Sequence, residues 1–224
     1  MNTIESVVLG VHIVAGFVAL FAGAGAIVTE KGGTRHRRLG RTYVYGMAVV
    51  STTALGLLAI EQSVGRIFLG LVAIFSFYFA YSGYRVLSRK RPADRAETED
   101  WVAVALFGLS GVGLLAMGGW FSLAGEAFAV VMFVFGAIAT VIAGQDVQRF
   151  RAATTEPREW FFEHLQRMGG AYIATVTAFG TVNFTFLPQI ARWLAPTLVG
   201  GIAIWYAARR YRQQFAAGAA PTTD

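Results

Sequence analysis

Cysteine is missing from this sequence of 224 residues, and charged residues are scarce. The missing cysteines exclude disulfide bridges, thiolate nucleophiles, and zinc or iron–sulfur centres held by thiolates. Asp, Glu, Lys and Arg together make up 14% of the chain, whereas a soluble domain usually carries about 25%. The few charges are clustered, and long apolar runs separate the clusters. This pattern indicates membrane-spanning helices rather than one large soluble core.

Apolar side chains are abundant: 55% of the residues are hydrophobic and the mean hydropathy is +0.53. Seven apolar segments can each hold a span of about 20 residues. They run approximately over Ile4–Val28, Thr42–Ile60, Ile67–Leu87, Trp101–Leu123, Ala127–Gly144, Phe161–Leu187 and Trp193–Ala208. We therefore predict an all-α, polytopic membrane helix bundle with about seven transmembrane helices, located in the plasma membrane. Residues 1–215 are expected to form one transmembrane bundle, and residues 216–224 a disordered C-terminal tail.

Charged residues and prolines near the ends of these segments predict where individual helices begin and end. Glu5 is the only charge before the first apolar run, and no basic residue precedes it. That run is therefore expected to be a retained helix rather than a cleaved signal peptide. Asp100 is expected to cap the fourth helix. Pro188 is expected to end the sixth helix, and Pro196 to lie in the first turn of the last.

The distribution of Lys and Arg predicts the orientation of the helices. Seventeen of the 19 basic residues lie in alternate connections, at their helix ends and in the tail, and only Arg66 and Arg192 lie on the opposite side. The positive-inside rule places the basic connections and the C-terminus in the cytoplasm. An odd number of helices then places the N-terminus outside. The net charge of +6 therefore indicates contact with anionic lipid at the cytoplasmic face, and no nucleic-acid partner is expected.

One histidine, His12, lies inside the first apolar run. An ionisable side chain at such depth usually faces the interior of the bundle and marks a functional position. Gly16 follows His12 by four residues and Gly23 follows Gly16 by seven, and small residues on one face let a second helix approach closely. His12 is therefore expected on the packed face. The alternative is a neutral imidazole that hydrogen-bonds to a neighbouring helix and has no further role.

The sixth span offers polar partners for His12. Thr177, Thr181 and Asn183 are expected at a comparable depth, and the two threonines share one face of the helix. The alternative is that the threonine hydroxyls bond to carbonyls of their own helix.

The other two histidines lie at the cytoplasmic ends of predicted spans. His36 follows a Gly-Gly turn before the second span, and His164 opens the sixth, directly after Glu163. Asp146 closes the fifth span on the same side. We predict that these side chains meet at one inner site: His36, Asp146, Glu163 and His164. Imidazole and carboxylate can ligate zinc or another divalent metal, and two imidazoles can ligate the iron of a b-type haem.

An arrangement without metal explains the same residues. Arg167 and Arg37 can pair with the carboxylates in a salt-bridge cluster, and this is the more common arrangement. The basic loop around His36 can equally be solvated and in contact with lipid head groups. At the end of the third span, Arg85 is expected to extend its guanidinium to the membrane interface.

Several motifs together resemble a known family. These motifs are His12 with Gly16 and Gly23, Lys31-Gly32-Gly33, His36-Arg37-Arg38, Ser82-Gly83-Tyr84-Arg85, Gln145-Asp146, Glu163-His164, Arg167-Met168 and Tyr172-Ile173-Ala174-Thr175. With them, the chain resembles, over nearly its whole length, a prokaryotic family of seven-helix membrane proteins catalogued only as a domain of unknown function. The resemblance implies the fold and marks all three histidines as motif positions, but it implies no activity.

Four functions fit these observations. The first is a binding site for haem or a divalent metal that uses His36, His164 and His12, in a redox or metal-dependent protein. Against haem, no helix carries two histidines at ligand spacing, and His12 differs in depth from the other two. The second is a small-solute or proton-coupled transporter, although no inverted repeat is visible. The third is a membrane-embedded metal hydrolase, and the fourth an accessory subunit of a larger complex. The histidine-centred site is favoured, with transport as the alternative.

Overall fold

The computed structural model describes residues 2–91, 93–152 and 158–217, and within them every regular element is helical. Seven α-helices and one short 3₁₀ helix follow one another along these residues. Their bounds are α1 Thr3–Val28, α2 Thr34–Ile60, α3 Val64–Arg85, η1 Val86–Ser88, α4 Thr98–Leu123, α5 Ala129–Arg151, α6 Glu159–Asn183 and α7 Gln189–Ala217. The predicted all-α fold is confirmed.

Within this described part of the chain, six helices are long and apolar enough to cross a membrane, and α6 does not belong to that set. The first half of α6 carries Glu159, Glu163 and Arg167, which lower its mean hydropathy. This helix nevertheless packs between α3 and α7 and also contacts α1. Its polar side chains are therefore placed against other helices, which is where a membrane bundle accommodates them.

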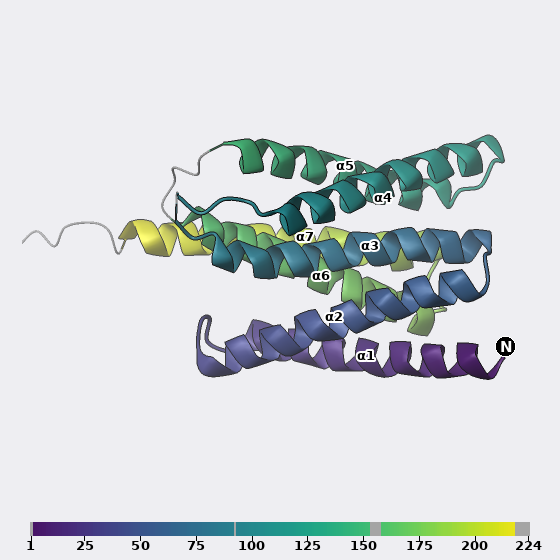
Figure 1. The fold of residues 1–224 in the computed structure, drawn as a ribbon, viewed down its shortest axis with the longest axis horizontal. Helices are drawn as coiled ribbons and strands as arrows, with labels where there is room; N and C mark the ends of the chain where they lie inside the picture. Colours follow the sequence, from purple (N-terminus) through teal and green to yellow (C-terminus); the bar gives the residue numbers. More distant parts are fainter. Residues whose placement is uncertain (1, 92, 153–157, 218–224) are drawn as a thin grey trace, which may run out of the picture.

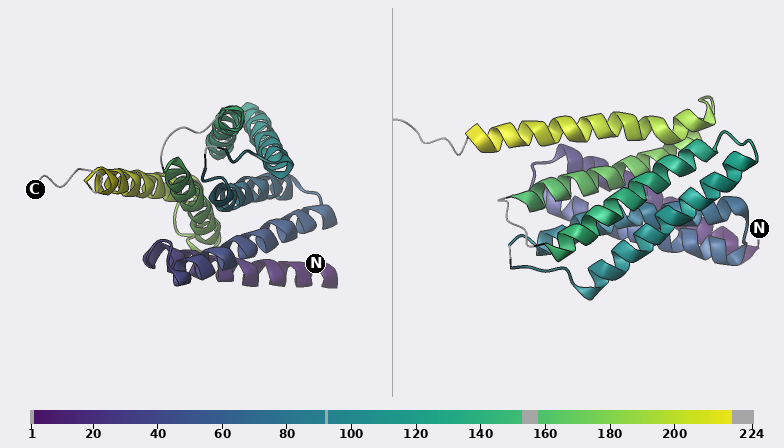
Figure 2. Two further views of the ribbon diagram at one scale, coloured as in Figure 1. Left: turned by 60° about the vertical axis from the view of Figure 1, so that its left-hand side comes forward. Right: turned by 90° about the horizontal axis from the view of Figure 1, so that it is seen from above.

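The helices form three neighbouring hairpins around α3 (Figure 1). Helix α1 packs on α2, α4 on α5, and α6 on α7, while α3 contacts α2, α4 and α6. Figure 2 shows α7 at the edge of the bundle. Helices α5 and α6 are consecutive in the chain, yet they do not pack closely together. Helix α5 packs instead on α4, and α6 packs on α3 and α7.

Small residues set the closest approaches between the helices. A Cβ atom added at Gly46 would lie 3.1 Å from the Cβ of Ala19, and this contact joins α1 to α2. Gly23 likewise meets Tyr172 and Tyr43, whereas Gly16 faces open space. The predicted packed face of α1 is therefore correct at Gly23 and wrong at Gly16.

Two helix starts differ from expectation because polar residues extend the helices beyond their apolar runs. Helix α2 begins at Thr34, eight residues before the predicted Thr42, and the added turns carry exposed arginines that are good helix formers. Asp100 is not the cap of α4. It is the N3 residue of a capping box in which Glu97 is the N-cap residue.

The C-terminal helix also differs from expectation. The carbonyl of Pro188 accepts a hydrogen bond from the amide of Arg192, so Pro188 lies at the start of α7, while α6 has already ended at Asn183. Pro196 is consequently inside α7 rather than in its first turn. Of the predicted disordered tail, residues 216–217 complete α7 and residues 218–224 lie outside the described residues.

Candidate functional site

Two of the three histidines lie together at one end of the bundle, as predicted. His36 is in the first turn of α2 and His164 in the second turn of α6. The centroids of their rings are 6.3 Å apart and the ring planes are inclined by 73°. Deeper in the bundle, the hydroxyls of Tyr43 and Thr175 share a hydrogen bond of 2.9 Å, which connects the same two helices.

The two imidazoles are oriented in the same way, each by a backbone carbonyl. His36 donates from Nδ1 to the carbonyl of Ala26 over 2.9 Å, and His164 donates from Nδ1 to the carbonyl of Gly83 over 2.7 Å. A carbonyl oxygen only accepts, so Nδ1 carries the proton and, in the neutral ring, Nε2 keeps a free lone pair. None of the described hydrogen bonds uses Nε2 of either ring. This is the tautomer that a metal-ligating histidine adopts.

The local cause of this arrangement is the end of a helix. Ala26 belongs to the last turn of α1 and Gly83 to the last turn of α3, where backbone carbonyls have no partner within the helix. The absence of a side chain at Gly83 also lets α6 approach α3, since an added Cβ would lie 2.9 Å from the Cβ of Arg167. The two histidines therefore donate hydrogen bonds to carbonyls at the C-terminal ends of α1 and α3. This capping role alone explains the position of both Nδ1 atoms.

Two lysine side chains lie near His164. The ammonium of Lys31 donates to the carbonyls of Ala26 and Ile27, and its partial burial lowers the pKa of Lys31 below the ordinary value. The ammonium of Lys90 lies 4.6 Å from the ring centre of Trp160. Both lysines are near enough to His164 to act on it electrostatically. These two ammonium groups therefore supply positive charge that can pair with a negatively charged ligand at His164.

The carboxylates that were expected beside the histidines lie elsewhere. Asp146 is buried, accepts a hydrogen bond of 2.5 Å from the hydroxyl of Tyr78 and pairs with Arg167. Glu163 lies 3.8 Å from Arg149. Within the residues described, no group of three His, Asp or Glu side chains is placed to hold a metal ion. The predicted site of His36, Asp146, Glu163 and His164 is therefore not formed, because Tyr78 and Arg167 already bind the two carboxylate oxygens of Asp146.

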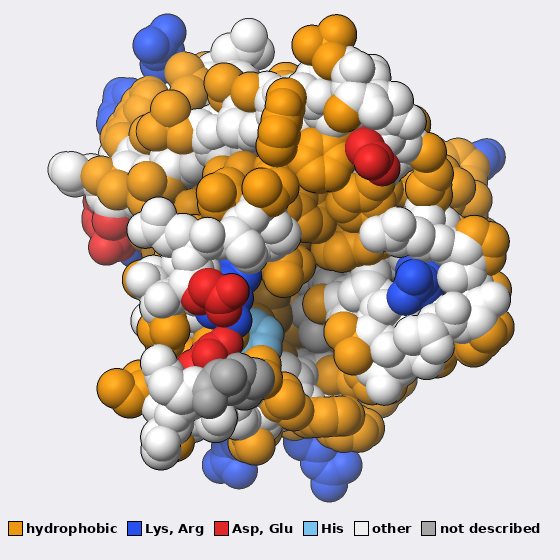
Figure 3. Space-filling model, turned by 90° about the vertical axis from the view of Figure 1, so that its right-hand side faces the viewer, with side chains coloured by type: hydrophobic (Ala, Val, Ile, Leu, Met, Phe, Trp, Pro, Cys, Tyr) orange, Lys and Arg blue, Asp and Glu red, His pale blue; other side chains and the backbone are white. Residues whose placement is uncertain are grey.

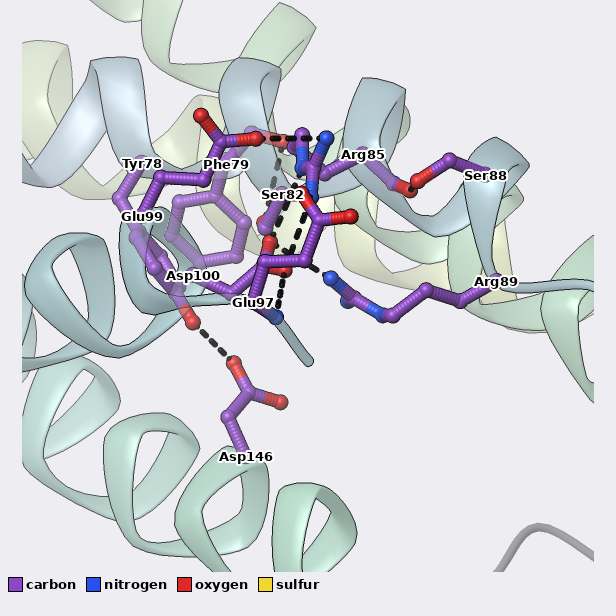
Figure 4. Close-up of polar contacts among 10 residues, drawn as sticks. All are labelled: Tyr78, Phe79, Ser82, Arg85, Ser88, Arg89, Glu97, Glu99, Asp100 and Asp146. Atoms are coloured by element: carbon purple, nitrogen blue, oxygen red, sulfur yellow. Dashed lines mark hydrogen bonds and ion pairs between the residues drawn. The ribbon is translucent and has the colours of Figure 1, made fainter. Parts of the chain in front are cut away.

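The salt-bridge alternative is confirmed for Arg167 and is wrong for Arg37, whose Nη1 donates to the carbonyl of Gly32 over 3.0 Å. Arg85 does not extend into the interface. It pairs with the three acidic residues at the start of α4, as Figure 4 shows: Glu97, Glu99 and Asp100. Sequence reasoning missed this cluster. The available signal was the alternation of a basic segment and an acidic segment between the third and fourth spans.

His12 is separate from the pair. Its Nδ1 lies 3.1 Å from the carbonyl of Val50 and 2.9 Å from the hydroxyl of Thr53, both on α2. The expected partners on α6 are wrong, since each of them donates to a carbonyl of its own helix: Thr177, Thr181 and Asn183. His12 is thus a hydrogen-bonding link between α1 and α2. Figure 3 shows the end of the molecule near the N-terminus, where acidic and basic side chains stand beside a histidine on a mostly apolar surface.

Comparison with known proteins adds no relative to this description. No protein-family model, no curated protein and no solved structure matches the chain. The family resemblance inferred from the motifs stays a prediction, and the chemistry of the histidine pair carries the proposal that follows.

Proposed function

We propose that this protein is a membrane haem protein in which His36 and His164 ligate the iron of one b-type haem, giving it a redox role. The observation that supports the proposal is the shared orientation of the two rings. Each Nδ1 is bound to a backbone carbonyl over less than 3 Å, and each Nε2 is free of a described protein partner. Histidine is a standard axial ligand of haem iron, and helical bundles commonly hold haem.

The spacing of the rings supports a single metal between them. Metal-to-nitrogen bonds of about 2.0–2.1 Å place the centroids of two imidazoles on opposite sides of one metal about 6 Å apart. The separation in this protein is 6.3 Å. A porphyrin supplies the other four ligands of an iron, so two histidines complete the coordination. A zinc ion would need about four ligands, and the described residues offer no third one near the pair.

The charges near the pair also favour haem over a bare divalent cation. Lys31 and Lys90 act on His164, and their positive charge would repel a divalent cation that has only two neutral ligands. A haem carries two propionate groups, and lysine ammonium groups can pair with them. His12 has no part in this proposal, because its Nδ1 is hydrogen-bonded to Val50 and Thr53 on α2, away from His36 and His164.

Absorption spectroscopy tests the proposal. Protein purified from haem-replete membranes should show a Soret band, and His36→Ala or His164→Ala should reduce the bound haem to less than about a tenth, since one axial ligand is lost. His12→Ala is the matched control and should keep the full band. A colourless wild-type protein with no bound metal in elemental analysis would contradict the proposal.

We further propose that the histidine pair lies at the cytoplasmic face of the plasma membrane, with the N-terminus outside and the C-terminus inside. The bias of 17 of 19 basic residues supports this orientation. Reporter fusions after Gly65 and Glu126 should report the outside, and fusions after Lys90 and Arg212 the cytoplasm. A cytoplasmic signal after Gly65 would overturn the orientation.

A small-solute or proton-coupled transporter is the second candidate. The observation that favours it is the buried contact of Asp146 with Tyr78 and Arg167, in which Nη1 of Arg167 is buried without a hydrogen-bond partner. Charged groups within a membrane bundle often lie on ion or proton pathways. Proton uptake by vesicles that contain the wild-type protein, lost in Asp146→Asn, would favour this function over the haem protein.

A further inference from the structure

A half-open groove of about 830 Å³ runs between α2 and α4, with α3 as its floor. Figure 1 shows α2 and α4 on either side of α3, and these two helices pack on α3 rather than closely on each other. Most of the lining is apolar and includes Leu55, Phe77 and Leu106. The groove therefore opens sideways, toward the lipid, between three of the helices that can cross a membrane.

One end of the groove is polar and negatively charged. Glu97 and Glu99 line it together with Tyr81. Both carboxylates contact Arg85 through one oxygen, yet their side chains remain 68% and 56% exposed. Asp100 pairs with Arg85 and Arg89. Of the residues that line the groove, only Glu97 and Glu99 carry a charge, so the charge that the groove presents to a ligand is negative.

The groove is short compared with a lipid. Its floor extends along α3 from Ile74 to Tyr81, which at 1.5 Å per residue is about 10 Å. One leaflet of a bilayer has a hydrocarbon depth of about 15 Å, so an acyl chain would extend well beyond the groove. A compact apolar molecule fits the length and the volume better. The aromatic rings of Phe77 and Tyr81, which line the groove, can also attract a cation.

We propose that this groove binds a compact, lipid-soluble organic cation, with its positive centre at Glu97, Glu99 and Tyr81 and its apolar body along α2, α3 and α4. Charge complementarity selects the sign, and the apolar, laterally open walls select a molecule that enters from the membrane. This inference goes beyond the haem site and does not depend on it, because the groove shares no residue with the histidine pair.

Tetraphenylphosphonium and tetraphenylborate are suitable probes, because they share one size and shape and differ in the sign of charge. Binding of each is measured by equilibrium dialysis to the full-length protein in nanodiscs of zwitterionic lipid, with empty nanodiscs as the blank. The cation should bind saturably, with one site per protein, and the borate should bind no more than it does to empty discs. Equal binding of both ions would overturn the proposal.

Two variants locate the site. Glu99→Gln should weaken cation binding about fivefold, the range of a partly exposed charge contact, and Ala103→Trp, which fills the groove, should abolish it. Glu61→Gln is the matched control, because Glu61 is a similarly exposed carboxylate that pairs with Arg66 away from the groove. Thermal unfolding of each variant checks that the fold is kept. Unchanged cation binding in folded Ala103→Trp protein would show that the cation binds elsewhere, and competition by ethanolamine lipids would assign the groove to a lipid head group instead.

Discussion

Replacing Asp146 by alanine is expected to destabilise the protein by about 3–5 kcal/mol, because one partner of a buried ion pair is removed and the other stays buried. The side chain of Arg167 is 5% exposed and that of Asp146 is 2% exposed. Nη1 of Arg167 already lacks a hydrogen-bond partner, so loss of Asp146 would leave this guanidinium without its carboxylate. The hydroxyl of Tyr78 would lose its acceptor at the same time. The substitution therefore destabilises the protein in two ways: it leaves Arg167 unpaired and Tyr78 without its hydrogen-bond acceptor.

Unfolding in mixed micelles by increasing fractions of a denaturing detergent measures this effect. Glu163→Ala is the control and should cost no more than about 1 kcal/mol, because a partly exposed pair at 3.8 Å is weak. The double variant Asp146→Ala/Arg167→Met should recover most of the loss, since replacing both members of a buried pair by apolar groups is often nearly neutral. Equal stability of Asp146→Ala and wild type would show that the pair is not buried in the membrane-embedded protein.

Gly136→Ala is expected to destabilise the contact between α4 and α5 by about 1–3 kcal/mol, the usual cost of forcing a methyl group into a packed interior. A Cβ atom at this position would lie 2.9 Å from the carbonyl oxygen of Gly111 and 2.9 Å from the amide nitrogen of Leu115. Both atoms belong to the backbone, so a change of rotamer cannot relieve the clash and the two helices must separate. Membrane helices associate largely through such close packing of small residues.

A glycine-to-alanine substitution at another position of α5 provides the control. Gly144 has nothing within 4 Å of its added Cβ, so Gly144→Ala should be neutral or stabilising by up to about 1 kcal/mol, the difference in helix propensity between alanine and glycine. The difference in midpoint between the two variants in the same detergent titration is the decisive quantity. Identical midpoints would contradict the close contact of α4 and α5.

Much of the architecture can be predicted from the sequence because the bilayer leaves few alternatives. Backbone amides and carbonyls in hydrocarbon must be paired within the chain, so a long apolar run between charged clusters becomes a helix. The expected spans accordingly coincide with the described helices, with errors at their polar ends such as the early start at Thr34. The proximity of His36 and His164 was also predictable, since the distribution of basic residues predicts that both lie on the same side of the membrane.

Only the tertiary structure decided which side chains became partners. Asp146 was expected in the site with His36 and His164, yet it binds Tyr78 and Arg167 because the packing of α6 on α3 places Arg167 toward α5. His12 turned toward α2 rather than α6 for a related reason: the contact of Gly46 with Ala19 brings α1 and α2 together. Apolar periodicity tells which residues avoid water but, in lipid, not which helices adjoin. That choice depends on short-range complementarity between helix surfaces, and it exists only once the helices are in contact.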